Sequence, residues 1–405
     1  MEITPILKSL RKNPVAGLLI SAQIALTLAI LANVLFVVTE RVATMAMSSG
    51  VDEPNVFVFG SQNIGNSRVP VDGTLADLEA INALPGVIAA TTQIGVPMGQ
   101  SGWQTSITLK PEEQIEGPER LAAVYMGGER LLDALGVKLL EGRNFRADEV
   151  TPWMSGDQPK PPVVLISKDL AERLFPGESA LGKMINITGD PGEPAQQVVG
   201  ITDSLASPWP RSRNSDRIVF VPLRPSGSTS FVVRTEPGER DRVMARVEEA
   251  LFAVDRNRIV DGIRDFEAIR DNAFESDRTM AVLLSAIALA LLAVTAFGIV
   301  GQASFWVTQR TKQIGTRRAL GAKRSDILRY FQTENALIAL LGIAAGSALA
   351  IAVNGLLVKY LSFGALPWNW LPVGALIVLV LGQLAVLGPA LRATRIAPAI
   401  ATRTA

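Results

Sequence analysis

Thr279–Thr308 reads TMAVLLSAIALALLAVTAFGIVGQASFWVT, 30 consecutive residues without a charged side chain. A helix needs about 20 apolar residues to cross the ~30 Å hydrocarbon core of a bilayer. Lipid offers no hydrogen bonds to an irregular backbone, so a helix is the expected form. Three more charge-free stretches are long enough to span: Val15–Val38, Ala336–Val358 and Leu371–Leu391.

The four stretches are spaced very unevenly, with one before and three after a polar segment of 240 residues. We therefore predict a membrane protein with four transmembrane α-helices in a 1+3 arrangement and a large α+β extracytoplasmic domain inserted between the first two. The predicted segments are an amphipathic N-terminal segment 1–14, transmembrane helix 15–38, extracytoplasmic domain 39–278, transmembrane helix 279–308, cytoplasmic loop 309–335, transmembrane helix 336–358, short extracytoplasmic loop 359–370, transmembrane helix 371–391 and cytoplasmic tail 392–405.

Basic residues set the expected orientation. The segments 1–14, 309–335 and 392–405 together hold 13 Lys and Arg against 3 Asp and Glu, whereas 39–278 holds 25 against 35. Loops rich in Lys and Arg remain on the cytoplasmic side. Both termini are therefore expected in the cytoplasm, and the chain is expected to be a multi-pass protein of the inner membrane.

The residue types that are missing exclude several kinds of chemistry. The chain has no histidine and no cysteine, which removes histidine-based triads, thiol nucleophiles and disulfides. The four spans carry no charge, whereas ion-driven transporters place ionisable residues there. We expect no catalytic residue, no metal site and no cofactor in this chain. Gln23, Asn33, Gln302, Asn354 and Gln383 are expected to join helices by hydrogen bonds.

Local patterns predict both strands and helices in the extracytoplasmic domain. Residues 55–59 alternate like a strand, and 74–84 reads as a helix with Thr74 as its cap. Ser167 is expected to cap a helix that ends at Phe175. Residues 266–277 look helical and lead into span two, which would make one long stiff element.

Two glycine motifs have alternative explanations. Gly177–Met184 nearly matches a phosphate-binding loop, but Met184 stands where Ser or Thr would contact magnesium, and a turn explains it better. Gly342 and Gly346 form a small-xxx-small pattern that suits close helix packing. That packing is expected within one chain or between two copies.

The loop 309–335 is the strongest functional signal. Gly315 and Gly321 interrupt it, and Ser325 is expected to cap the helix that follows. A loop that only set topology would need neither the glycines nor the apolar residues around them. We therefore expect a docking segment for a cytoplasmic partner, formed by Ile314, Gly315, Arg317, Arg318, Ala319, Leu320, Gly321 and Ala322.

These residues resemble the "EIGxRRALGA" coupling segment of MacB/FtsX-type permeases, also called type VII permeases of ATP-binding-cassette (ABC) systems. Gln313 replaces the usual Glu. The tail 388–398 is similar to the family's "YPARRAARLDP" ending, and 164–183 resembles its MacB-like periplasmic core domain. Leu84–Val87 and Glu141–Phe145 fit that domain as well.

The resemblance implies several partners. These are a cytoplasmic ABC ATPase dimer that binds ATP and Mg²⁺, a second permease copy or a related permease, and a periplasmic adaptor with an outer-membrane channel, but no nucleic acid. It implies a non-catalytic permease subunit that obtains ATPase activity from a separate chain and moves its periplasmic domains mechanically for export. The alternative is a membrane-anchored receptor or scaffold without ATPase coupling.

Overall fold

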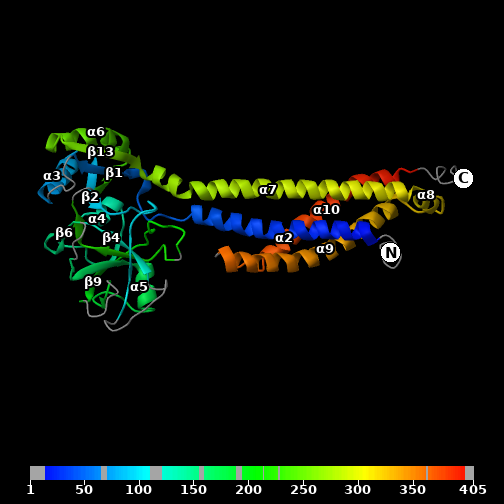
Figure 1. The fold of residues 1–405 in the computed structure, drawn as a ribbon, viewed down its shortest axis with the longest axis horizontal. Helices are drawn as coiled ribbons and strands as arrows, with labels where there is room; N and C mark the ends of the chain where they lie inside the picture. The colour runs from blue at the N-terminus through cyan, green and yellow to red at the C-terminus, as the bar shows by residue number, and fades with distance from the viewer. Residues whose placement is uncertain are drawn as a thin grey trace. The chain divides into compact units, whose positions relative to one another are not determined.

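The computed structural model describes nine helices and thirteen strands in the parts of the chain that it places (Figure 1). The described residues are 14–64, 71–109, 121–154, 159–187, 194–212, 214–226, 229–361 and 364–396. The amphipathic segment expected over residues 1–14 lies almost entirely outside them, as does the end of the tail.

The helices and strands have the following bounds. The helices are α2 Pro14–Met45, α3 Val71–Asn82, α4 Leu131–Leu135, α5 Lys168–Leu174, α6 Arg240–Val254, α7 Phe266–Gln309, α8 Thr311–Ala319, α9 Arg324–Leu361 and α10 Trp370–Thr394. The strands are β1 Val56–Asn63, β2 Val87–Gln93, β3 Trp103–Ser106, β4 Leu121–Met126, β5 Leu139–Gly142, β6 Thr151–Trp153, β7 Val163–Ser167, β8 Met184–Ile185, β9 Gln196–Thr202, β10 Ile218–Val221, β11 Leu223–Pro225, β12 Thr229–Thr235 and β13 Arg258–Asp265.

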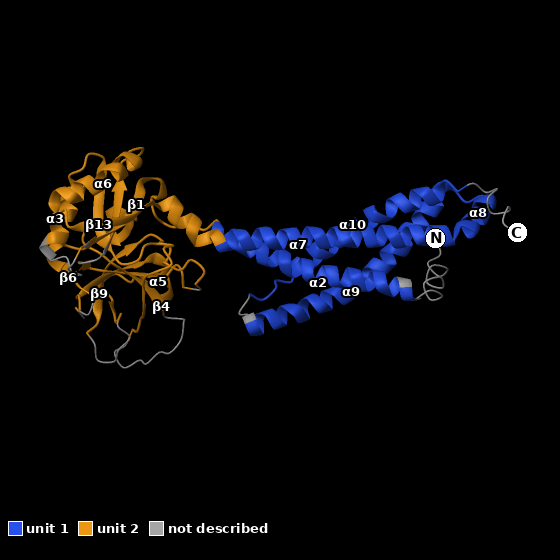
Figure 2. Ribbon diagram, turned by 45° about the horizontal axis from the view of Figure 1, so that its top comes forward, with its two compact units in different colours: residues 1–45, 276–405 blue, residues 46–275 orange. Residues whose placement is uncertain are grey.

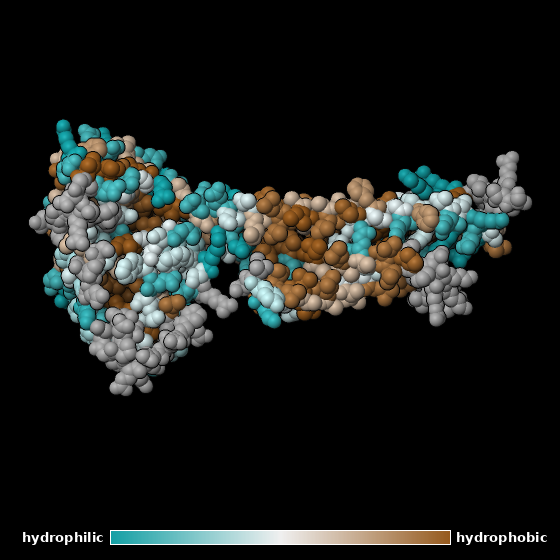
Figure 3. Space-filling model, in the orientation of Figure 1, coloured by the Kyte–Doolittle hydropathy of each residue, from teal (hydrophilic) through white to brown (hydrophobic). Residues whose placement is uncertain are grey.

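The chain divides into two compact units, coloured blue and orange in Figure 2. The helical unit contains residues 1–45 and 276–405, and the second unit contains 46–275. Four helices, α2, α7, α9 and α10, are long and apolar enough to cross a membrane. Hydrophobic residues cover much of their visible surface (Figure 3), as expected for helices that face lipid. The predicted four-helix fold class is confirmed.

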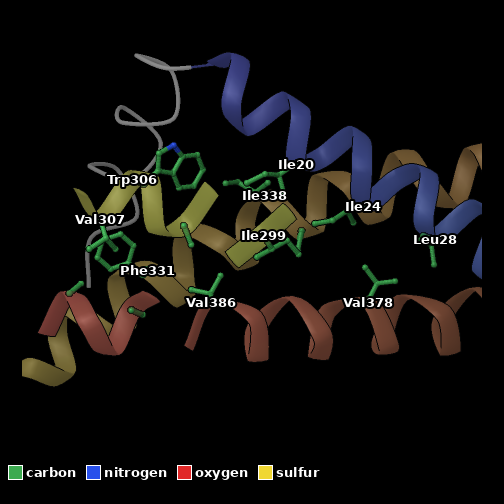
Figure 4. Close-up of a cluster of buried hydrophobic side chains, with 14 of the residues drawn as sticks. Ile20, Ile24, Leu28, Ile299, Trp306, Val307, Phe331, Ile338, Val378 and Val386 are labelled. Carbon is green, nitrogen blue, oxygen red and sulfur yellow. The ribbon is translucent and has the colours of Figure 1, made fainter. Parts of the chain in front are cut away.

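The helical unit has a core between its helices. Side chains from α2, α7, α9 and α10 meet there (Figure 4), among them Ile24, Ile299, Ile338 and Val378. All four are almost completely buried. The core continues to the start of α9, where Phe331 is buried as well.

Helices α2 and α9 approach one another closely because α9 has glycines at the contact. A Cβ atom on Gly342 would lie 2.8 Å from the carbonyl oxygen of Ser21, and one on Gly346 would lie 2.8 Å from that of Ala25. Neither position has room for a side chain. The small-xxx-small pattern therefore serves packing within one chain.

We predict that Gly346→Ala destabilises the helical unit by about 1–3 kcal/mol, because the added methyl group overpacks the contact with α2. Gly355→Ala, in the same helix, is the matched control, since nothing lies within 4 Å of a Cβ there. The midpoint of thermal unfolding in detergent measures the difference. Equal midpoints for the two variants would contradict this view of the contact.

The second unit contains two main sheets, each with its own core. The first has the order β13-β1-β12-β2, is antiparallel throughout, and is covered by α3 and α6. Phe59 and Phe231 stack in its core, with ring centroids 5.0 Å apart. The second sheet has the order β3-β4-β10-β7-β9-β5, with β8 also paired to β9 and α5 against β7. The predicted α+β domain is confirmed, and its two sheets form two lobes.

Several local predictions for this unit can be compared with the structure. Ser167 does cap α5, because its Oγ accepts a hydrogen bond from the Leu170 N–H. Thr74 does not cap a helix. It lies buried inside α3, which begins at Val71. The segment 151–162 is rich in Pro and polar residues, which favours a loop, but β6 forms at its start because Thr151–Trp153 pairs with β11.

An ion pair follows β5 in the Glu141–Phe145 motif. The Arg143 guanidinium donates to both carboxylate oxygens of Glu149, at 2.8 and 2.6 Å. Hydrogen bonding from Arg143 lowers the pKa of Glu149, and the Arg146 backbone N–H adds to the effect. A carboxylate with a lowered pKa stabilises the fold above its unfolded pKa, and this contribution is lost as the pH falls through the folded-state value.

We predict that Glu149→Gln destabilises this unit by about 1 kcal/mol at pH 7, because a charge-assisted pair that is partly open to solvent is lost. The difference from the unchanged chain should disappear at a pH well below the ordinary Glu pKa of about 4.3. Urea midpoints from pulse proteolysis of the whole chain across this pH range provide the measurement. Glu248→Gln, on the exposed face of α6, is the control, and a difference independent of pH would argue against the assignment.

Helix α7 is one continuous helix of 44 residues, as the sequence predicts. Its first turns belong to the second unit, where Phe266, Ile269 and Phe274 are buried. There the Arg270 guanidinium donates to Glu53 Oε1 and to the Met47 carbonyl oxygen, both at 2.6 Å. The remainder of α7 belongs to the helical unit.

Candidate functional site

The predicted docking segment forms α8 and the turn after it. Helix α7 ends at Gln309, Arg310 follows, and α8 covers Thr311–Ala319. Gly321 then adopts a left-handed conformation with φ +96°, which ends the helix without strain because glycine has no Cβ. Ser325 does not cap the next helix, because α9 already begins at Arg324; the Asp326 carboxylate accepts the Lys323 N–H at 2.9 Å instead.

One face of α8 packs onto α9. Ile314 and Gly315 are buried, and Ile314 joins the same core as Ile327 and Phe331. A small cavity of about 70 Å³ remains between the two helices, with Gln313 and Tyr330 in its lining. Ile314 and Gly315 therefore attach α8 to the membrane helices.

A buried ion pair lies under the start of α8. Arg310 Nη1 donates to both carboxylate oxygens of Glu334 on α9, at 2.9 and 2.8 Å. The Glu334 side chain is 1% exposed, and the Arg310 guanidinium also lies 5.7 Å from the ring of Trp306. Removing one partner of such a pair leaves a buried charge without compensation, which is strongly destabilising. The pair therefore ties the junction of α7 and α8 to α9 where the predicted docking segment begins.

Arg318 links the docking segment to the tail motif. Its Nη1 donates to the carbonyl oxygens of Thr394 and Ile396, at 2.7 and 2.9 Å. These carbonyls lie at the C-terminal end of α10, where a cation is favoured by the helix dipole and satisfies open acceptors. The two sequence motifs are thus in direct contact.

The remaining motif residues separate into two groups. Arg317 lies over the ring of Tyr330 at 5.0 Å, so it also packs along α9. By contrast, Ala319, Leu320 and Gly321 are exposed, and Leu320 shows 83% of its surface. We call these three residues the α8 tip. Ala322 is half-buried and leads into α9.

Sequence reasoning did not identify Glu334 or the carbonyls of Thr394 and Ile396 as parts of this site. A signal for Glu334 was available, since it is an acidic residue next to span three in a strongly basic loop. The backbone carbonyls carry no side-chain signal. The pattern at Gly177–Met184 forms a turn as predicted: Lys183 binds Glu178 and lies 4.4 Å from the Phe175 ring.

Comparison with known proteins places this arrangement in a family. Residues 22–250 match the MacB-like periplasmic core domain, and residues 285–398 match the FtsX-like permease C-terminal domain. The chain belongs to the MacB/FtsX-like family of ABC transporter permeases. It is thus a multi-pass membrane protein with a periplasmic domain.

Relatives in this family include longer proteins. A macrolide export ATP-binding/permease protein MacB from Shewanella sp. (strain W3-18-1) is 29% identical over 74% of this chain and 43% of its own length. One from Yersinia pestis bv. Antiqua (strain Antiqua) is 28% identical over 73% and 42%. The chain thus spans less than half the length of these relatives. The periplasmic region of MacB from Actinobacillus actinomycetemcomitans aligns with a TM-score of 0.33 and 13% identity, over 55% of this chain and 94% of that structure.

We predict that Arg318→Ala frees α8 from α10, because two charge-assisted hydrogen bonds to the α10 carbonyls are lost. Bonds of this kind contribute about 1.5–3 kcal/mol, so opening of α8 should become roughly ten- to a hundredfold more frequent. Hydrogen–deuterium exchange of peptides from 311–322 in detergent measures it. Arg329→Ala removes an exposed arginine from α9 and should leave the exchange unchanged; a similar effect of both substitutions would refute the assignment.

Proposed function

We propose that this chain is a permease subunit that converts ATP hydrolysis by a separate ABC ATPase into movement of its periplasmic domain. The exposed α8 tip is the observation that supports this most. An exposed leucine between small residues is suited to insertion into a recess of a partner protein. Four attachments hold the helix behind it: the burial of Ile314, the Arg310–Glu334 pair, the Arg317–Tyr330 contact and the Arg318 hydrogen bonds. Force applied at the tip would therefore reach α7, α9 and α10.

The complex that we propose contains two permeases and two cytoplasmic ATPase subunits, which bind the ATP and Mg²⁺. The second permease is another copy of this chain or a related one. The distribution of Lys and Arg supports an inner-membrane protein with both termini and α8 in the cytoplasm. A periplasmic adaptor and an outer-membrane channel would complete the route out of the cell.

The transport direction that we propose is export of a substrate that enters from the periplasm. The relatives named above are macrolide export proteins, which supports an efflux role. The four charge-free stretches fit a mechanism in which no ion gradient drives transport through this chain. The energy for transport then comes from ATP hydrolysis by the ATPase, and the periplasmic domain acts on the substrate or on the adaptor.

We predict that Leu320→Asp abolishes binding of the ATPase, because a charge replaces the apolar side chain that enters the partner. A loss of at least about tenfold in affinity corresponds to 1.4 kcal/mol, within the range for a buried anchor residue. Co-purification of the chain with a co-expressed ABC ATPase from the same operon provides the measurement. Leu140→Asp is the control, because Leu140 is also an exposed leucine (50%) but lies in the periplasmic unit.

Two results would contradict this proposal. If no ATPase co-purifies with the unchanged chain, an anchored receptor or scaffold becomes the better explanation. If Leu320→Asp and Leu140→Asp retain the ATPase equally, the α8 tip is not the docking point.

A further inference from the structure

Helix α2 contacts both α7 and α9, and the two contacts differ in kind. Three side-chain contacts connect α2 with α7: Gln23 Nε2 donates to the Val294 carbonyl oxygen at 3.2 Å, the Thr27 and Thr295 hydroxyls share a hydrogen bond at 2.7 Å, and Arg41 Nη1 binds Asp277 Oδ1 at 2.5 Å. Side-chain hydrogen bonds also join α2 to α9, from Ser21 Oγ to the Ile338 carbonyl oxygen and from Asn33 Nδ2 to that of Ala350. There, however, the glycines of α9 also bring the helix directly against the backbone of α2.

Two of these contacts, Thr27–Thr295 and Arg41–Asp277, lie on the same side of each helix. Thr27 and Arg41 are 14 residues apart, and Asp277 and Thr295 are 18 apart, which are close to whole numbers of turns at 3.6 residues per turn. Gly298 of α7 faces the Gln23 side chain rather than a backbone, since a Cβ there would lie 2.6 Å from Gln23 Oε1. At this position a flexible polar side chain, and not close backbone packing, separates the two helices.

These contacts can break and re-form more easily than the packing of α9 on α2. A hydrogen bond between helices in a bilayer contributes little on average, because the separated groups find other partners. Moving α9 away from α2 would instead open a void along a close-packed contact. The outermost contact differs from the other two, because the Asp277 side chain is 1% exposed and requires a cation while it remains buried.

We propose that α7 moves as a separate element against a rigid group formed by α2, α9 and α10, and that the Arg41–Asp277 pair is the latch that holds it at rest. When α7 tilts away, Asp277 exchanges Arg41 for water at the membrane boundary. Helix α7 is continuous from Phe266 to Gln309, and its first turns belong to the periplasmic unit. A tilt of the end next to α8 would therefore also move these first turns. The role of the latch in ATP coupling rests on the proposed function, whereas the latch itself is a property of this chain.

Spin-label distances in the whole chain, reconstituted in lipid nanodiscs, test the latch. The chain has no cysteine, so introduced cysteines are labelled uniquely. Leu19→Cys with Val282→Cys reports on α2 and α7, and Leu19→Cys with Ile351→Cys reports on α2 and α9. All three side chains are exposed, at 58%, 63% and 58%.

Arg41→Ala should increase a separated α2–α7 population about tenfold, as expected for loss of one charge-assisted contact, and leave the α2–α9 distances unchanged. The charge exchange Arg41→Asp with Asp277→Arg should restore the original α2–α7 distribution. If Arg41→Ala does not fold, the double substitution Thr27→Val with Thr295→Val provides the test. It removes the hydrogen bond between α2 and α7 and keeps the shape of both side chains. An unchanged α2–α7 distribution, or equal changes in both distances, would overturn the proposal.

A second experiment tests the role of the latch in ATP coupling independently of the latch itself. The labelled chain is purified with its ATPase, and distances are measured without nucleotide and after trapping with ATP and vanadate. The α2–α7 distance should change and the α2–α9 distance should not. If no ATPase binds, or trapping changes neither distance, the coupling role is overturned, while the measurements on the chain alone still decide the latch.

Discussion

A backbone that crosses hydrocarbon must satisfy its own hydrogen bonds, and the rest of this structure depends on that constraint. It makes the four spans helical and leaves side chains as the means by which the helices recognise one another. In lipid, apolar side chains gain little from meeting each other, so small residues and polar contacts decide which helices pack and how closely. Gly346 brings α9 against α2, whereas Thr27 and Thr295 connect α2 to α7.

Charged contacts concentrate at the ends of the spans. Arg41–Asp277 lies just before the charge-free stretch 279–308 of α7 and Arg310–Glu334 just after it, and in each pair the acid is almost completely buried. A buried pair of this kind contributes little net stability compared with an apolar contact, but separating its partners inside the protein leaves a buried charge without compensation. Such pairs therefore suit positions where the angle of a helix matters for its neighbours.

The parts of the fold that depend on local pattern could be predicted from the sequence. The four spans, the α+β domain, the continuity of α7 and the Ser167 cap follow from hydrophobic runs, periodicity and capping chemistry. Thr74 and Ser325 were assigned as caps wrongly, because helix ends depend on which nearby donors find partners. In the site, the segment 314–322 could be recognised, but the bond from Arg318 to Thr394 joins positions 76 residues apart. No local pattern specifies a contact with a backbone carbonyl at that separation.

The arrangement around Gln313 shows why a departure from the family pattern is compatible with the site. Gln313 lines the cavity beside α9 together with Arg310 and Arg317, where a glutamate would place a negative charge next to two arginines. Arg310 already has its carboxylate in Glu334, and Arg317 lies over Tyr330. The attachment of α8 therefore does not need a charge at position 313. The amide keeps the size of glutamate but leaves the surface around the α8 tip more positive, which would favour an acidic rim on the partner that we propose for Leu320.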